Sequence, residues 1–161
     1  MDFFLGLAQL IGVHTILGLS AYVVLQTGQV TMSQAGFFSI GAYLAAMLTT
    51  LAGWHIVPAL FVGAIVAGLV AGLVGFPALR VKGLMLVVAT VAFGEFIRLF
   101  WFNFDYQIAK GGILIGPEGG EGFKQIRFFP ENGWTTGEVA LFIWVFVILI
   151  MLALWWVDRS R

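Results

Sequence analysis

The sequence predicts an all-α integral membrane protein with about five transmembrane helices. Of its 161 residues, 61% are hydrophobic and 10% are charged, whereas soluble domains carry about 25% charged residues. Five apolar stretches each approach the roughly 20 residues that a helix needs to cross the hydrocarbon core. We interpret them as helices, because an open strand edge cannot be satisfied in lipid and the short alternating segments of a membrane barrel do not occur.

The first three predicted spans cover residues 3–25, 30–52 and 56–79. The second span is the most polar of the five, so it is expected either to cross the membrane or to re-enter on the same side. The third span begins through Pro58 in its first turn and ends near Pro77, positions at which proline is tolerated or stops a helix.

The last two predicted spans cover residues 84–104 and 139–157. The fifth span is preceded by Thr135 and Glu138, which have the spacing of a capping box. In that motif a hydroxyl and a carboxylate pair with backbone amides that have no partner at a helix start. The motif therefore predicts a helix that begins directly after Thr135.

Basic residues predict the orientation of the chain. Arg80 and Lys82 lie between the third and fourth spans, and Arg159 and Arg161 follow the fifth span. Two spans separate these clusters, so both lie on one side, which the positive-inside rule makes cytoplasmic. We expect a single transmembrane domain over residues 1–161, with no soluble domain and with residues 105–137 as an external loop.

The fourth span carries an acid near its middle. A charge at this depth is costly and by default indicates a polar pathway or a buried pair. Arg98 lies one helical turn after Glu95 and can supply the partner. We therefore expect either a structural ion pair between Glu95 and Arg98 inside the bundle, or a role for Glu95 in the translocation path.

Small residues recur at every fourth position of the third span. This spacing lets helix backbones approach closely, which substitutes for the hydrophobic driving force that is missing in lipid. The pattern favours a central helix in a multi-helix core over a simple dimerising span. The predicted packing residues are Gly63, Ala67, Gly68, Ala71, Gly72 and Gly75.

Uncharged polar residues gather where the first two spans meet. Amides and hydroxyls at this junction are suited to a zwitterionic or amide-bearing solute, although they also fit a well-solvated turn. Together with Glu95, four of them form the predicted translocation path: Gln26, Thr31, Ser33 and Gln34.

Composition excludes several kinds of site. Eight basic and eight acidic residues balance, which argues against nucleic acid as a partner. The chain has no cysteine, and its two histidines lack the spacing of metal ligands, so no metal or catalytic site is predicted. The glycine-rich segment 111–122 lacks the Gly-Lys-Ser/Thr ending of a phosphate-binding loop. We therefore expect no cofactor in this chain and no enzymatic activity.

Three stretches of the chain together resemble the motifs of one family of membrane proteins. The segment TGQVTMSQAGFFSIGAYLAAML (27–48) is similar to one family motif, although Ser33 and Gln34 replace the usual Gly-His. The segment PALRVKGLMLVVATVAFGEFIRL (77–99) is similar to a second and more specific motif. The third stretch, KGG at 110–112, lies where such proteins often have Thr-Gly-Gly. The family that the three stretches resemble is that of the permease subunits of bacterial ATP-binding-cassette (ABC) importers for branched-chain amino acids, the livM-like group.

The resemblance implies a multisubunit importer in the bacterial inner membrane. Its other members would be a second permease subunit, two cytoplasmic ATPase subunits that bind the ATP, and a periplasmic or lipid-anchored solute-binding protein. These subunits and the membrane lipid are the expected partners. Such permeases have about twice this length, so the chain is expected to correspond to an N-terminal half.

Two alternatives stay open from the sequence. Relatives in the same family carry urea or short amides. A homodimeric channel or secondary transporter built from five-helix units is a different class of protein. Dependence of uptake on ATP and on a binding protein separates this second alternative from an ABC importer.

Overall fold

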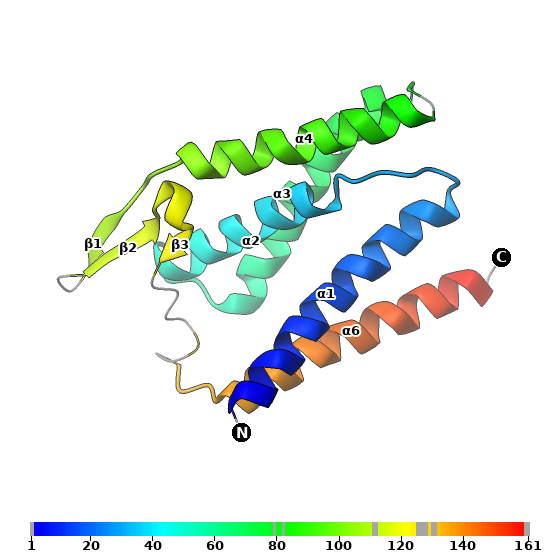
Figure 1. Cartoon of the computed structure of the whole chain (residues 1–161). Helices are drawn as coiled ribbons and strands as arrows, with labels where there is room; N and C mark the ends of the chain where they lie inside the picture. The colour runs from blue at the N-terminus through cyan, green and yellow to red at the C-terminus, as the bar shows by residue number, and fades with distance from the viewer. Residues whose placement is uncertain are drawn as a thin grey trace. The chain divides into compact units, whose positions relative to one another are not determined.

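The computed structural model describes residues 2–78, 80–81, 83–110, 113–124, 129 and 132–159. These residues confirm the predicted all-α membrane protein, with one short sheet added (Figure 1). Lys82, Gly111, Gly112 and Arg161, on which part of the sequence interpretation depends, lie outside the described residues. The long helices are α1 (Asp2–Gln26), α2 (Gln34–Thr50), α3 (Ile56–Ala78), α4 (Leu84–Asn103) and α6 (Thr136–Arg159).

Four of the described helices are long and apolar enough to cross a membrane, namely α1, α3, α4 and α6. The helix α2 has only 17 residues and begins at Gln34, four residues after the predicted start of the second span. The preceding residues from Gln29 to Ser33 have no regular secondary structure. The second predicted span is therefore part extended chain and part helix.

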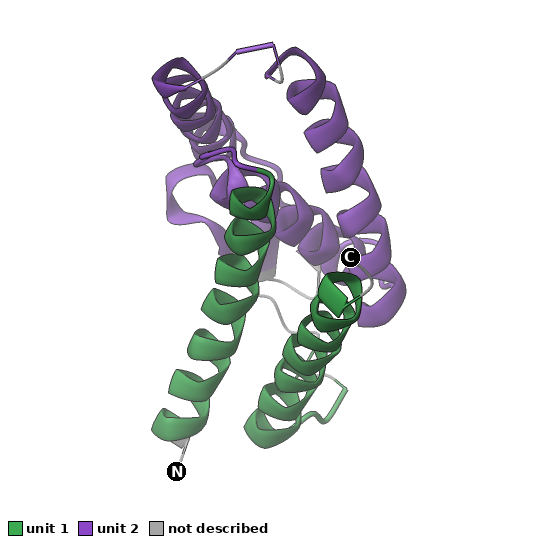
Figure 2. Cartoon of the chain, turned by 90° about the vertical axis from the view of Figure 1, so that its right-hand side faces the viewer, with its two compact units in different colours: residues 1–27, 129–161 green, residues 28–128 purple. Residues whose placement is uncertain are grey.

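The chain forms two compact units, which Figure 2 colours separately. The first unit contains α1 and α6. The Gln9 side chain donates to the carbonyl of Thr136 at 2.8 Å, near the start of both helices. Gln26 and Asp158 meet at the other end, with 3.3 Å between the amide nitrogen and the nearer carboxylate oxygen. The helices α1 and α6 are therefore parallel.

The second unit contains α2, α3 and α4. The helices α2 and α3 form an antiparallel hairpin, which is closest where Gly41 faces Gly63. The helix α4 also packs on α2, through contacts of Gly36 with Phe93 and of Tyr43 with Trp101. Both contacts join residues separated by nearly the same distance in sequence, so α2 and α4 run parallel.

The predicted external loop is structured over part of its length. Three antiparallel strands pair in the order β1 (Ile108–Lys110), β2 (Ile113–Pro117) and β3 (Phe123–Lys124). Gly116 has φ of +142°, and its missing side chain admits the carbonyl oxygen of Tyr106. The amide of Gly119, in a short 3₁₀ turn (Gly119–Glu121), donates to the carbonyl of Phe104 at 3.1 Å. The sheet is thereby tied to the end of α4.

Candidate translocation site

The segment from Gly28 to Thr50 follows α4 along its length. Its first residues share a groove with the beginning of α4. Further along, the backbone amide of Met32 donates to the hydroxyl of Thr90 at 3.1 Å. At the far end, the rings of Tyr43 and Trp101 stack with their centroids 4.1 Å apart. The segment thus runs from one end of α4 to the other, as a crossing segment does and a re-entrant loop does not.

The helix α2 begins beside the middle of α4. Gly36 in its first turn lies against Phe93 and Gly94. At a rise of 1.5 Å per residue, Gly94 is about 15 Å along a helix of about 30 Å. The start of α2 and the extended residues before it therefore lie at mid-depth in this unit, beside the two continuous helices α3 and α4.

The first turn of α2 leaves backbone donors without helical partners. The first amide that bonds back to Ser33 is that of Phe37, at 3.2 Å. The preceding amides of Gln34, Ala35 and Gly36 are the ones that a helix start leaves unsatisfied. Ser33 occupies the N-cap position, yet its side chain makes no cap hydrogen bond. The positive end of α2 is thus available to an acceptor or an anion.

Two of the predicted path residues bond to each other at this helix start. The Gln34 side-chain amide donates to the Thr31 hydroxyl at 3.0 Å. Ser33 lies between them and is buried. Thr90 lies on the α4 side of the break. Its hydroxyl accepts from the Met32 amide and also donates to the carbonyl of Val87 at 2.9 Å. Sequence reasoning missed Thr90, although a hydroxyl inside an apolar span was a visible signal.

A groove of about 530 Å³ lies between residues 28–30 and the first turn of α4. Most of its side chains are aliphatic, and Gln29 supplies the amide group. The groove can therefore accept an apolar group next to a polar backbone. It is lined by Gly28, Gln29, Val30, Val81, Gly83, Leu84, Leu86 and Val87.

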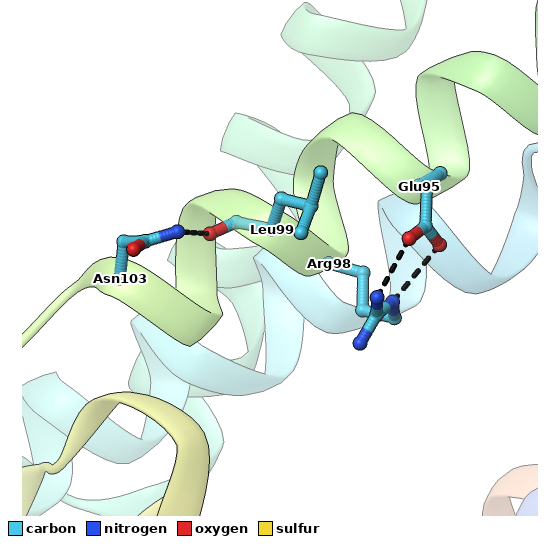
Figure 3. Close-up of polar contacts among 4 residues, drawn as sticks. All are labelled: Glu95, Arg98, Leu99 and Asn103. Atoms are coloured by element: carbon cyan, nitrogen blue, oxygen red, sulfur yellow. Dashed lines mark hydrogen bonds and ion pairs between the residues drawn. The ribbon is translucent and has the colours of Figure 1, made fainter.

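Glu95 and Arg98 form a two-pronged ion pair on α4 (Figure 3). The Nε of Arg98 donates to one carboxylate oxygen at 2.9 Å, and Nη2 donates to the other at 2.6 Å. The side chains of Arg98 and Glu95 are 61% and 52% exposed. The described structure brings the two residues together but does not bury them, in contrast to the expected position inside a bundle.

The other predicted path residues are divided. Glu95 lies five residues after Thr90, which is about 140° round the helix and away from the face that contacts α2. Gln26 belongs to the first unit, where its amide donates to the Tyr22 hydroxyl at 2.7 Å and to the carboxylate of Asp158. The structure therefore groups Thr31, Ser33 and Gln34 and separates them from Glu95, while Gln26 makes its contacts in the other unit.

The small residues of α3 are used unequally. Gly63 is buried against the backbone of Gly41, and Ala67 lies close to the same glycine. A Cβ on Gly68, Gly72 or Gly75 would meet no atom within 4 Å. Ala71 is partly exposed. Close packing is thus present at Gly63 and Ala67, and the packing role of the other four positions stays a prediction.

A family model described as the permease component of the branched-chain amino acid transport system matches residues 3–160. The chain belongs to this family. It is a multi-pass membrane protein, and the relatives that it matches are transport permeases.

Two relatives carry the name high-affinity branched-chain amino acid transport system permease protein LivM. The protein from Escherichia coli (strain K12) is 30% identical over 169 residues, covering 95% of this chain and 40% of the relative. The protein from Salmonella typhimurium (strain LT2) is 30% identical over 163 residues, covering 91% and 38%. The chain thus spans about two fifths of the length of these relatives. No solved structure matches it.

Proposed function

We propose that this chain forms the translocating part of an ABC importer for branched-chain amino acids in the bacterial inner membrane. The observation that carries the proposal is the start of α2 at mid-depth, with its first amides unpaired by the helix. Irregular backbone at membrane depth is tolerated where it is buried in protein or lines a water-filled cavity. Interrupted helices of this kind hold substrates in many transporters.

The chemistry of the break suits an aliphatic α-amino acid. The positive end of α2 attracts a carboxylate, for which the amides of Gln34 to Gly36 are donors. The oxygens of the Thr31 hydroxyl and the Gln29 amide can accept from an ammonium group. The groove along α4 offers aliphatic walls to a branched side chain. Urea or a short amide would use the same polar groups but would leave the positive helix end and the aliphatic walls unused.

The energy source lies outside this chain in the proposed assembly. The sequence has no phosphate-binding loop, so ATP is bound by two cytoplasmic ATPase subunits. A second permease subunit completes the membrane part, and a periplasmic or lipid-anchored solute-binding protein delivers the amino acid. Membership of a family of transport-system permease components supports an assembly with further subunits.

The substitution Gln34→Glu tests the proposed carboxylate site. It nearly preserves the size of the side chain, and a negative charge in the first helical turn favours the fold of α2. The same charge neutralises the helix end and repels the carboxylate of the substrate. We expect ATP-dependent leucine uptake by the assembled importer to fall at least tenfold with unchanged membrane levels. Gln107→Glu, in the segment that follows α4, is the matched control.

Three outcomes would contradict the proposal. Normal leucine uptake by the Gln34→Glu importer would remove the helix end from the path. Uptake of urea or acetamide that survives the substitution, together with weak leucine transport by the unsubstituted importer, would favour the amide permease instead. Uptake that needs neither ATP nor a binding protein would favour the channel or secondary transporter.

A further inference from the structure

The hydroxyl of Ser33 is a buried polar group that makes no hydrogen bond within the described part of the chain. Ser33 is 8% exposed, and its side chain makes no cap bond to α2. A capping serine normally has an extended backbone, which lets its oxygen accept from the second or third amide of the helix. Ser33 instead has φ of −83° and ψ of −8°, which are helical values. The backbone conformation therefore accounts for the missing cap bond.

The Ser33 hydroxyl is not sealed from its surroundings. Over the described residues, one side-chain polar atom is both inaccessible and unbonded, and it is Nε1 of Trp101. The hydroxyl of Ser33 is unbonded but does not belong to this class, so part of its surface is accessible. It can therefore bond a group that enters the site from outside the protein.

Three backbone donors lie beside this hydroxyl. The amides of residues 34–36 have no helical partner, because the first amide that bonds back to Ser33 is that of Phe37. The amide of Met32, on the other side of Ser33, already donates to the hydroxyl of Thr90 at 3.1 Å. The start of α2 thus presents three amides and one hydroxyl, which together are four donors that the described protein leaves without acceptors.

We propose that Ser33 is a substrate-binding residue, whose hydroxyl donates to the substrate carboxylate beside the amides of residues 34–36. The inference rests on the proposed function, in which a carboxylate occupies this helix end. An ionised carboxylate only accepts hydrogen bonds, and its two oxygens offer about four lone-pair sites. It therefore matches a set of four donors. An ammonium group has only donors and would leave the three amides unsatisfied.

A role in binding predicts that Ser33 serves transport without serving the fold. Its hydroxyl has no protein partner, so removing it breaks no bond of the folded chain. Removing a buried polar group leads to a large loss of stability when a bonded partner is left unsatisfied, which does not apply here. The bound carboxylate, in contrast, loses a donor. Stability and uptake should therefore respond differently to the same substitution, whereas a structural hydroxyl would affect both.

The substitution Ser33→Ala tests this separation in the assembled importer. We expect leucine uptake at limiting leucine to fall at least tenfold, because a hydrogen bond to a charged group contributes about tenfold or more to affinity. The SDS fraction at which the purified chain unfolds should not decrease. Ser33→Thr retains a hydroxyl and should keep most of the uptake. Ser39→Ala is the matched control, since the Ser39 hydroxyl on the same helix already donates to the carbonyl of Gly36 at 2.7 Å.

Protection of a cysteine tests whether the carboxylate lies at this position. The sequence has no cysteine, so Ser33→Cys is the one thiol in the chain. The purified importer, without its binding protein, is treated with N-ethylmaleimide in the presence of leucine or of isoamylamine. Isoamylamine has the ammonium group and the side chain of leucine but no carboxylate. We expect leucine to slow the alkylation at least threefold and isoamylamine at the same concentration to leave it nearly unchanged.

Three results would overturn the inference. Normal leucine uptake by a stable Ser33→Ala importer would show that the hydroxyl bonds only water; if Gln34→Glu still abolishes uptake, the proposed function stands and the role of Ser33 alone is wrong. Loss of both stability and uptake in Ser33→Ala, with neither restored by Ser33→Thr, would make Ser33 a packing residue. Equal protection of Ser33→Cys by leucine and isoamylamine would place the carboxylate away from this hydroxyl.

Discussion

Replacement of Gly63 by alanine tests the contact that holds α2 and α3 together. A Cβ at this position would lie 2.7 Å from the carbonyl oxygen of Gly41 and 3.5 Å from the carbonyl carbon. Both obstacles are backbone atoms, so no side-chain rotation can relieve the clash. Restoring a separation of about 3.4 Å requires the two helices to move apart by roughly 0.7 Å at their closest point.

The cost follows from comparison with a second glycine on the same helix. Overpacking a close contact typically costs about 1–3 kcal/mol. Alanine also favours a helix over glycine by up to about 1 kcal/mol, and this gain applies equally to Gly63→Ala and to Gly68→Ala. A Cβ at Gly68 meets nothing within 4 Å. The difference in unfolding free energy between the two variants should therefore equal the clash, about 1–3 kcal/mol.

This difference can be measured by unfolding the purified chain in mixed micelles. The fraction of SDS is increased, and tryptophan fluorescence reports the unfolding. We expect Gly68→Ala to unfold at the same SDS fraction as the unsubstituted chain or at a higher one, and Gly63→Ala at a lower one. Gly41→Ala should fall between them, since its Cβ would make ordinary contacts of 3.6 and 3.8 Å. Equal stability of Gly63→Ala and Gly68→Ala would refute the close approach of α2 and α3.

Two further predictions concern the break in the second span and the topology. Thr90→Val should destabilise the fold by about 1–3 kcal/mol, because it leaves the amide of Met32 without an acceptor, whereas Thr90→Ser should retain most of the stability. Thr49→Val is the control, since among the described residues that buried hydroxyl bonds carbonyls of its own helix. Equal losses for Thr90→Val and Thr49→Val in the same SDS titration would contradict the assigned bond. In whole cells, a cysteine at Asn132 should react with an impermeant thiol reagent, and a cysteine at Arg80 should react only after permeabilisation; the reverse pattern would invert the orientation.

The start of α6 was predictable because its determinants are local in sequence. Thr135 and Glu138 form the expected reciprocal contacts: the Thr135 amide donates to the carboxylate at 2.7 Å, and the Glu138 amide donates to the hydroxyl at 3.4 Å. The helix begins at Thr136, directly after the cap. Both partners lie within one turn, so the sequence contains the complete interaction.

The start of α2 was not predictable, because its determinants lie far apart in sequence. Residues 30–33 continue the apolar and polar pattern of a span, and no proline marks a break. The amide of Met32 instead bonds Thr90, 58 residues away. Once this amide has a partner in α4, the chain can remain extended without losing a backbone bond. A bond between residues so far apart in sequence cannot be recognised from the residues around Met32.

The small residues of α3 show the same limit for packing. Gly63 and Gly68 both belong to rows of small residues, and the pattern predicted contacts for both rows. Only the face that includes Gly63 and Ala67 meets α2 in the described unit. Periodicity identifies which residues share a face, but it does not say which face receives the neighbouring helix.

The helix directions in the two units bear on whether the second span crosses the membrane. The helices α1 and α6 are parallel, so an odd number of crossings must lie between them if both span the membrane. The helices α3 and α4 supply two of these, so the segment 28–50 must supply the third. If that segment re-entered, α6 would run antiparallel to α1, in conflict with the contacts of Gln9 with Thr136 and of Gln26 with Asp158 at opposite ends of the pair. Contacts within the other unit lead to the same conclusion, because they make α2 parallel to α4, as a crossing second span requires. A helix of 17 residues rises about 25 Å, slightly less than the roughly 30 Å of a hydrocarbon core, so irregular backbone within the membrane fits this crossing and supports the proposed path at the start of α2.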